Sequence, residues 1–262
     1  MASAACRAWR STSNGTVFIQ LLSLGRIPYA EAMEVQQRVV AARKQGLIGD
    51  TLLLLEHPPV LTLGRNASRA NVLASDELLA TRGVELHEVN RGGDVTYHGP
   101  GQLVGYPILD LRGDLPGKRG PYLGPVDFVR LLEEVLIRTC AEFGVMAKRI
   151  PKCTGVWTFG GGDSAEKIAE KKIAAIGVHV SQGVTSHGFA LNVTTDLRDF
   201  EWIIPCGIRD RGVTSLELEA DSSTEPTMDR ALNATARNFG HVFRRQMLWC
   251  ESIDQLLAPA VR

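Results

Sequence analysis

One cysteine, Cys206, lies in a short segment that could carry out acyl transfer, Ile203-Ile204-Pro205-Cys206-Gly207-Ile208. Proline fixes a backbone φ angle and Gly207 has no side chain, so backbone N–H groups near the thiol are open to a substrate oxygen. Such a thiol could hold an acyl group as a thioester. A buried cysteine in a tight turn would have the same neighbours, so the segment alone leaves both interpretations open.

A cysteine nucleophile needs a nearby base or cation, because a thiol with an ordinary pKa of about 8.5 is only a few per cent thiolate at neutral pH. Lys172 begins the strand-like segment KIAAIGVHV, and it falls on the same face as Ala174, Ile176 and Val178. An ammonium group kept out of water beside the thiol would favour the thiolate. The alternative is a lysine at a strand end whose ammonium group reaches solvent.

A glycine-rich segment, RGGDVTYHGPGQ at residues 91–102, could bring backbone close to a ligand and contains His98. It matches neither GxxxxGK[ST] nor GxGxxG, so it does not indicate a nucleotide site, and a tight connection between strands would explain it equally well. The six histidines show no HExxH spacing and the cysteines no CxxC spacing, so we expect no metal site.

Composition narrows the class of protein. The chain has 262 residues, 44% of them hydrophobic, which is enough for a large core, and its 29 basic and 29 acidic residues give a net charge of +0, which argues against general nucleic-acid binding. Five scattered cysteines indicate a reducing compartment without a disulfide framework. No run approaches the roughly 18 apolar residues of a membrane span. We expect a cytoplasmic protein; the arginines before Glu31 leave a mitochondrial or plastid location as the alternative for a eukaryotic source.

These residues must be positioned by one mixed α/β domain. Hydrophobic periodicity predicts helices at residues 29–45, 76–82, 126–143 and 228–247, and strands at 16–24, 51–55, 60–63, 84–89, 103–111, 155–159, 172–180 and 187–193. We expect a flexible N-terminal tail at residues 1–15, the catalytic domain at 16–250 with a polar hairpin insertion at 159–171, and a C-terminal tail at 251–262.

Four segments in this order carry a family resemblance: residues 91–111, 172–180, SHGFALNV at 186–193 and PCGI at 205–208. Together they resemble the lipoyl(octanoyl) transferase family of lipoate biosynthesis, over about residues 26–215. The resemblance implies a fold similar to the catalytic domain of biotin and lipoate protein ligases, a mixed, mostly antiparallel sheet flanked by helices. It also implies an acyltransferase that moves octanoyl from acyl carrier protein to a lysine of a lipoyl domain.

The resemblance also implies the roles of individual residues. Cys206 matches the acyl-thioester nucleophile, and Lys172 matches the lysine that lowers the pKa of that thiol. The insertion contains a second Lys-Ile pair at Lys167, but only Lys172 has the spacing KIxxxG, so Lys172 is preferred. The residues that match the family's substrate-lining positions are Arg91, Gly92, Gly93, Asp94, Val95, Thr96, Tyr97, His98, Ala175, Ile176, Gly177, Gly188, Phe189 and Ala190.

The partners implied are octanoyl-acyl carrier protein, whose phosphopantetheine carries the octanoyl group, and the lipoyl domains of 2-oxoacid dehydrogenase complexes and the glycine cleavage H protein. No further cofactor is expected. Because such carriers are acidic, we expect a local basic patch drawn from Arg65, Arg69, Lys148, Arg149, Lys152, Arg209 and Arg211. Two alternatives are an ATP-dependent lipoate or biotin ligase of the same fold and a non-catalytic protein that binds acyl carriers.

Overall fold

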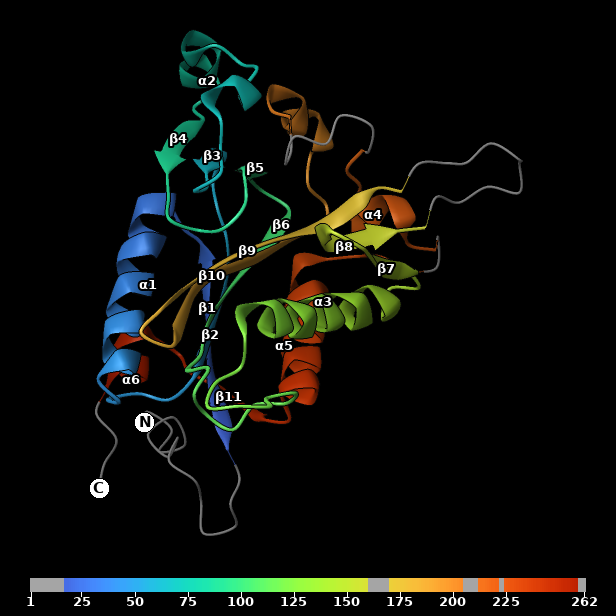
Figure 1. Cartoon of the computed structure of the whole chain (residues 1–262). Helices are drawn as coiled ribbons and strands as arrows, with labels where there is room; N and C mark the ends of the chain where they lie inside the picture. Colours follow the sequence, from blue (N-terminus) through green and yellow to red (C-terminus); the bar gives the residue numbers. More distant parts are fainter. Residues whose placement is uncertain (1–16, 160–169, 205–211, 222–223, 259–262) are drawn as a thin grey trace.

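The structure is a computed structural model that describes residues 17–159, 170–204, 212–221 and 224–258 (Figure 1). Its strands are β1 (Phe18–Arg26), β2 (Thr51–Glu56), β3 (Val60–Leu63), β4 (Glu85–Glu88), β5 (Val95–His98), β6 (Gln102–Ile108), β7 (Ala147–Ile150), β8 (Cys153–Thr158), β9 (Lys172–Ser181), β10 (Val184–Asn192) and β11 (Gln246–Trp249). Its helices are α1 (Tyr29–Lys44), α2 (Asp76–Thr81), α3 (Pro125–Ala141), α4 (Leu216–Glu219), α5 (Met228–Phe243) and α6 (Ile253–Leu257).

Two sheets organise the fold. Within the described residues, eight strands form one sheet in the order β11-β1-β2-β6-β10-β9-β8-β7, and three form a small sheet in the order β4-β3-β5. In the large sheet β1 runs parallel to β11 and β2, and the other described pairs are antiparallel. This mixed, mostly antiparallel sheet flanked by helices confirms the predicted fold class.

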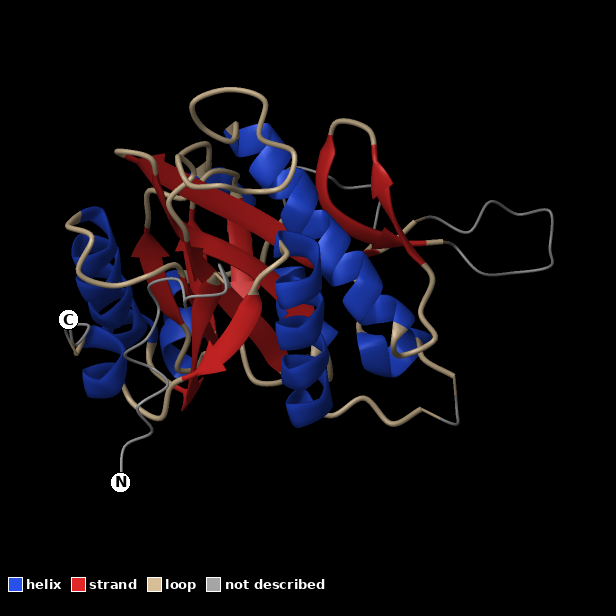
Figure 2. Cartoon of the chain, turned by 90° about the horizontal axis from the view of Figure 1, so that it is seen from below, coloured by secondary structure: helices blue, strands red, loops and turns tan. Residues whose placement is uncertain are grey.

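Both faces of the large sheet are covered by helices (Figure 2). Successive residues of a strand point to opposite faces, so Leu52 and Leu54 enter a core shared with α3 and α5, whereas Leu53 and Leu55 enter a core shared with α1 and α6. Because β2 is buried on both faces, it has an uninterrupted apolar sequence. The strands near the middle of the sheet are therefore held rigidly from both sides.

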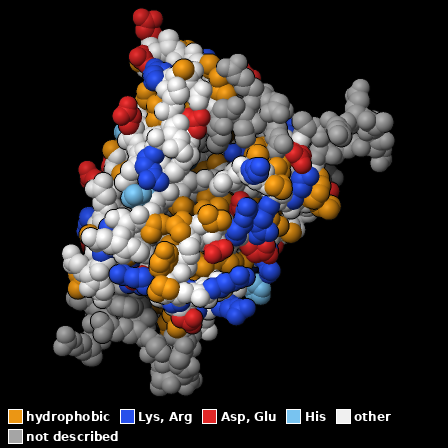
Figure 3. All heavy atoms as spheres, viewed as in Figure 1, with side chains coloured by type: hydrophobic (Ala, Val, Ile, Leu, Met, Phe, Trp, Pro, Cys, Tyr) orange, Lys and Arg blue, Asp and Glu red, His pale blue; other side chains and the backbone are white. Residues whose placement is uncertain are grey.

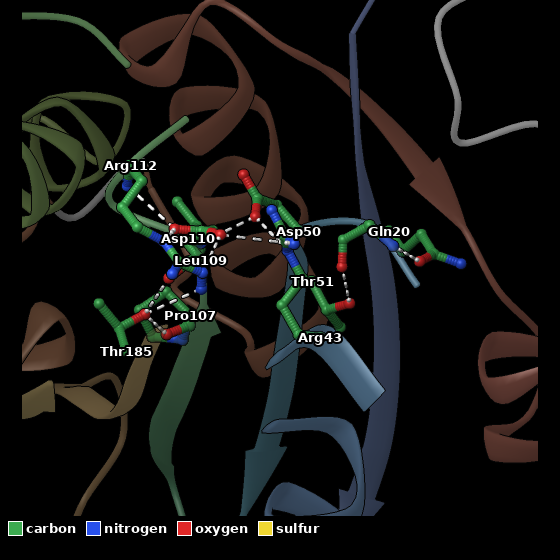
Figure 4. A network of polar contacts seen from close by, with 10 residues as sticks. Gln20, Arg43, Asp50, Thr51, Pro107, Leu109, Asp110, Arg112 and Thr185 are labelled. Carbon is green, nitrogen blue, oxygen red and sulfur yellow. Dashed lines mark hydrogen bonds and ion pairs between the residues drawn. The ribbon is translucent and has the colours of Figure 1, made fainter. Parts of the chain in front are cut away.

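A polar network fixes one end of β2 and β6 (Figure 4). Arg43 donates from Nε to Asp50 Oδ1 at 2.8 Å, and the same oxygen accepts the N–H of Asp110 at 2.9 Å. Burial raises the pKa of Asp50, with the Arg43 guanidinium opposing this. Thr185 Oγ1 accepts the N–H of Leu109 at 2.9 Å and joins β10 to the same end. The opposite end of these strands is left for the glycine-rich segment.

The small sheet is where the sequence prediction was least accurate. Residues 60–63 were expected to continue the large sheet but form β3, and Val95–His98 was expected in a glycine-rich loop but forms β5. These two strands are antiparallel, with Val60 opposite His98. The pairing partner of β5 is distant in sequence, so no local pattern indicates that the short run between glycines is a strand.

The C-terminal region also differs from the prediction. The helix expected to continue to Met247 ends at Phe243, where Arg244 adopts a left-handed φ of 54°, and β11 then pairs parallel with β1. Met247 keeps a helical spacing of four residues to Phe243, but pairing with β1 overrides it. Residues 251–262 were expected to form a C-terminal tail, but part of this range forms helix α6. Ser252 caps the helix by accepting the N–H of Gln255, and Leu256 of the helix is buried.

Two further findings concern cysteines and membranes. Cys140 and Cys153 form no disulfide, but Cys250 takes part in one, so the expectation of a chain without disulfides is wrong there. Sequence spacing gave no warning, because disulfide geometry depends on distance in space. Among the described residues, no helix combines the length and the apolar composition that crossing a bilayer would require.

Candidate active site

A cavity of about 380 Å³ lies against β6, β9 and β10 and beside the glycine-rich segment. Three parts of the chain that were expected to contact substrate meet there: the segment before and within β5, the middle of β9 and the middle of β10. From the expected set the cavity is lined by Arg91, Gly93, Asp94, Val95, Thr96, His98, Lys172, Ala175, Ile176, Gly177, Gly188, Phe189 and Ala190.

Lys172 is the first residue of β9, and its side chain is only 8% exposed. Its Nζ lies 4.8 Å from the centre of the Trp157 ring on β8, a cation–π arrangement. Its backbone N–H donates to Gly212 O at 2.9 Å, and its carbonyl accepts the N–H of Thr214 at 3.0 Å. Of the two interpretations from sequence, the structure supports the buried lysine; the neighbouring Lys171 is exposed instead.

Glycines allow the strands around the cavity to approach closely. A Cβ at Gly188 would lie 2.1 Å from Gly105 O, and a Cβ at Gly177 would lie 2.7 Å from Gly92 O. Gly92 in turn donates its N–H to Val178 O at 3.0 Å. The glycine-rich segment is thereby attached to β9, and any side chain at these positions would separate the cavity walls.

Arg91 supplies a buried positive charge at the cavity. Its Nη2 donates to Thr62 O at 2.6 Å and to Thr62 Oγ1 at 2.9 Å, and its Nη1 donates to Gly92 O at 3.1 Å. These bonds join the glycine-rich segment to β3 of the small sheet. Because the oxygens of Thr62 and Gly92 bind the guanidinium at several points, Arg91 has one orientation and places a fixed positive charge at the cavity.

His98 belongs to a chain of hydrogen bonds that determines its tautomer. Asn192 Nδ2 donates to Thr214 O at 2.8 Å, which leaves Asn192 Oδ1 to accept from Gln102 Nε2 at 2.9 Å. Gln102 Oε1 must then accept from His98 Nδ1, at 2.7 Å. The neutral ring therefore carries its proton on Nδ1, and Nε2 keeps a lone pair. Burial lowers the pKa of His98 to about 3, with His57 adding to the effect.

Tyr106 and His187 also line the cavity, and His57 lies behind this wall, bonded to Tyr106. His57 donates from Nδ1 to Ile27 O at 2.9 Å and accepts the Tyr106 hydroxyl at 2.7 Å. His187 Nε2 lies 2.7 Å from Asn90 Oδ1. Burial lowers the pKa of His57 and of His187 to about 4, and it raises the pKa of Tyr106. These rings are uncharged at neutral pH, so this part of the wall can accept an apolar group.

Two expected substrate residues do not line the cavity. Gly92 lies against β9, as described above, and Tyr97 turns into the core of the small sheet. The Tyr97 hydroxyl donates to Asp199 Oδ2 at 2.5 Å, and its ring packs edge-on against Phe200 and Trp202. The physical reason is the alternation of a strand, since Thr96 and His98 of β5 face the opposite way from Tyr97.

The cavity also contains residues that sequence reasoning missed. They are Tyr29, Asn66, Val104, Tyr106, Lys152, Cys153, Thr154 and His187. His187 directly precedes Gly188 and holds a left-handed φ of 54°, which the sequence does not reveal. One signal in the sequence could have indicated two of these residues. In the predicted strand at 103–111, period-2 alternation places Val104 and Tyr106 on the same face.

Cys206 and the basic residues Arg209 and Arg211 lie outside the described residues. The described residues on either side of this segment contact the site. Gly212 O accepts the backbone N–H of Lys172. Ile204 donates its N–H to Asn71 O, and the Asn71 side chain donates to Asp94 of the cavity at 2.7 Å. Cys153 is a second thiol, and it lies in the cavity wall itself. Among the described side chains, no group of three His, Cys, Asp or Glu could hold a metal ion.

The expected basic patch is only partly present. Arg149 pairs with Glu133 at 3.1 Å and Glu134 at 2.8 Å, Lys148 pairs with Glu170 at 2.7 Å, and Arg69 pairs with Asp76. Lysine and arginine side chains on the face in Figure 3 accordingly alternate with acidic ones. Among the described residues, exposed cations at these spaces include Lys152 in the cavity wall and Arg65 in an adjoining groove.

Comparisons with known proteins identify the family of this chain. The family model for the lipoyl protein ligase A/B catalytic domain matches residues 28–240. The octanoyltransferase of Acidobacterium capsulatum is 65% identical over 240 residues, which cover 91% of this chain and 96% of that protein. The octanoyltransferase of Koribacter versatilis is 53% identical over 239 residues, which cover 91% of this chain and 90% of that protein.

A solved structure shows the same fold at low identity. The bi-partite lipoate protein ligase of Thermoplasma acidophilum superposes with a TM-score of 0.63 at 19% identity, covering 91% of this chain and 89% of that chain. The family match and the close relatives together identify the activity. The chain belongs to the lipoyl protein ligase A/B catalytic-domain family, and within it to the octanoyltransferases, which are acyltransferases.

Proposed function

We propose that this octanoyltransferase takes octanoyl from the phosphopantetheine thioester of an acyl carrier protein, holds it on Cys206 and passes it to a lysine of a lipoyl domain. The observation that carries the proposal is the buried Lys172 in the cavity wall, bonded through its backbone to Gly212 beside the segment of Cys206. A buried ammonium group next to a thiol favours the thiolate and can move protons.

In the first half-reaction the Cys206 thiolate attacks the thioester carbonyl carbon. The bond from that carbon to the carrier's sulfur breaks, and Lys172 gives a proton to the departing pantetheine thiolate. One thioester replaces another, so the step is nearly thermoneutral and depends mainly on positioning. The cavity, with neutral rings at its far end, receives the apolar chain.

In the second half-reaction the acceptor lysine forms an amide and the thioester to Cys206 breaks. The acceptor ammonium loses two protons in this step, one to the neutral Lys172 amine and one to water, and Cys206 leaves as the thiolate. A covalent intermediate lets two protein substrates use one site in turn. Ping-pong kinetics are therefore expected. No step consumes ATP, in contrast to a ligase that first activates a free acid.

The test is intact-mass measurement after mixing the protein with octanoyl-acyl carrier protein in the absence of ATP. The expected result is one octanoyl adduct that maps to Cys206 and disappears when a lipoyl domain is added. Cys153→Ser is the matched control, because Cys153 is a cavity thiol that the proposal leaves without a role. An adduct on Cys153, or transfer that needs ATP, would contradict the proposal.

Neighbouring lysines give a second matched pair. Lys172→Met is expected to slow adduct formation by about a hundredfold or more, the usual effect of losing a positioned acid or base. Lys171→Met changes the adjacent, exposed lysine and should keep the normal rate. Equal rates in the two variants would remove Lys172 from the mechanism.

A further inference from the structure

The cavity ends at a partition with an open groove behind it. Tyr29 and His187 line both the cavity of about 380 Å³ and a groove of about 870 Å³. The groove is lined by residues of α1 and by the β9–β10 hairpin, and Met33, Val40 and Val184 give it apolar surface. Only two side chains thus belong to both spaces among the described residues.

Strand register places this partition at the far end from Lys172. His187 lies opposite Val178 on β9, and Val178 is six residues beyond Lys172, a distance of about 20 Å at the rise of a strand. An extended octanoyl chain measures about 9 Å, at roughly 1.3 Å per carbon from a C–C bond of about 1.5 Å. The Lys172 side chain and the thioester occupy part of the remainder. A chain of sixteen carbons is about 10 Å longer than octanoyl, so together with the thioester it fills this length and would meet the partition.

The two side chains of the partition are held in place. The Tyr29 ring packs against His57 and His87, with centroids 5.1 and 5.0 Å apart. The His187 backbone N–H donates to Gln36 Oε1 at 3.0 Å, and its ring binds Asn90. Burial raises the pKa of Tyr29 to about 12 and lowers that of His187 to about 4, so both are neutral and tolerate an apolar chain end.

We propose that Tyr29 and His187 limit the length of the acyl chain, and that the groove behind them would receive the extra carbons of a longer chain if the partition were removed. The inference rests on the proposed function, because it assumes that the cavity holds the acyl group. It assigns to these two residues a role in specificity and no part in the reaction itself.

His187→Gly is the informative variant. The left-handed φ of 54° at this position suits glycine, so the change opens the wall without backbone strain. His179→Ala is the matched control, because His179 lies one residue along β9 from the partner of His187 and lines the groove but not the cavity. Tyr29→Ala opens the same wall from α1 and serves if the glycine variant unfolds.

The experiment offers each protein an equal mixture of octanoyl and hexadecanoyl pantetheine thioesters and measures the two adducts by intact mass. His187→Gly is expected to raise the hexadecanoyl-to-octanoyl ratio by about tenfold or more over wild type, and His179→Ala should leave it unchanged. A ratio within twofold of wild type in both opened variants, with octanoyl adduct still formed, would overturn the inference. Failure of the wild-type protein to form any octanoyl adduct would instead contradict the proposed function.

Discussion

Acidification from pH 7 to pH 5 is expected to destabilise the protein strongly, because three histidines around the cavity are buried as neutral rings. Burial lowers the pKa of His57 and His187 to about 4 and that of His98 to about 3. In an unfolded chain the imidazole pKa is about 6.5. Between pH 6.5 and pH 4 the unfolded state therefore binds protons that the folded state does not bind. The contribution of these neutral histidines to the free energy of unfolding is complete above pH 6.5 and is lost as the pH falls toward 4.

The size of the effect follows from these values. One such histidine costs about 2 kcal/mol at pH 5 and only about 0.2 kcal/mol at pH 7, since each pH unit between the two pKa values is worth about 1.4 kcal/mol. Three together remove about 5 kcal/mol, a large part of the 5–15 kcal/mol that stabilises a typical domain. The carboxyl groups of Asp110 and Asp196, whose pKa values are lowered by Arg112 and Arg198 against burial, titrate below this range.

The free energy of unfolding, measured in urea at pH 7, 6 and 5, tests this expectation. His57→Gln keeps a donor for Ile27 O and an acceptor for the Tyr106 hydroxyl but cannot be protonated, so it should remove about a third of the loss. His241→Gln, on the exposed side of α5, is the control for removing an imidazole elsewhere. A loss below about 2 kcal/mol in wild type, or an undiminished loss in His57→Gln, would refute the reasoning.

Two further expectations concern stability. Gly188→Ala should lower the free energy of unfolding by about 2–3 kcal/mol, because its Cβ would lie 2.1 Å from Gly105 O. Gly120→Ala is the control, because its Cβ would have no atom within 4 Å. Equal urea midpoints for the two variants would contradict the argument that the strands approach closely at Gly188. Arg149→Glu should lower the free energy of unfolding by about 3 kcal/mol, measured by calorimetry, because it leaves the fully buried Glu133 facing a second carboxylate. Lys152→Glu is the control and should have little effect. An Arg149→Glu protein as stable as wild type would make Arg149 a docking candidate again.

Hydrophobic periodicity predicted the long elements well, and the failures share one physical cause. Helix α3 and strands β9 and β10 bury long regular faces, which the sequence shows directly. By contrast β5 and β11 have four residues each and exist because β3 and β1 offer them a backbone edge. A strand of that length lacks enough residues to show a pattern, so only the assembled sheet reveals it.

For the candidate site, family resemblance located the walls but not the end of the cavity. Most of the expected residues line it, yet Tyr29, Tyr106 and His187 were missed, because they contribute from three separate elements and have no common motif. Tyr97 illustrates the reverse error. It was included as part of a continuous segment, although alternation along a strand turns its side chain away from that of His98.

Thr214 connects His98 and Lys172 through hydrogen bonds. Its carbonyl ends the hydrogen-bond chain through Asn192 and Gln102 that places the His98 proton on Nδ1, and its N–H binds the carbonyl of Lys172. The tautomer of the histidine and the backbone position of the lysine thus depend on one residue of the chain that follows the Cys206 segment. A shift of Thr214 would alter both groups together, so this residue positions the site without needing to contact the acyl group.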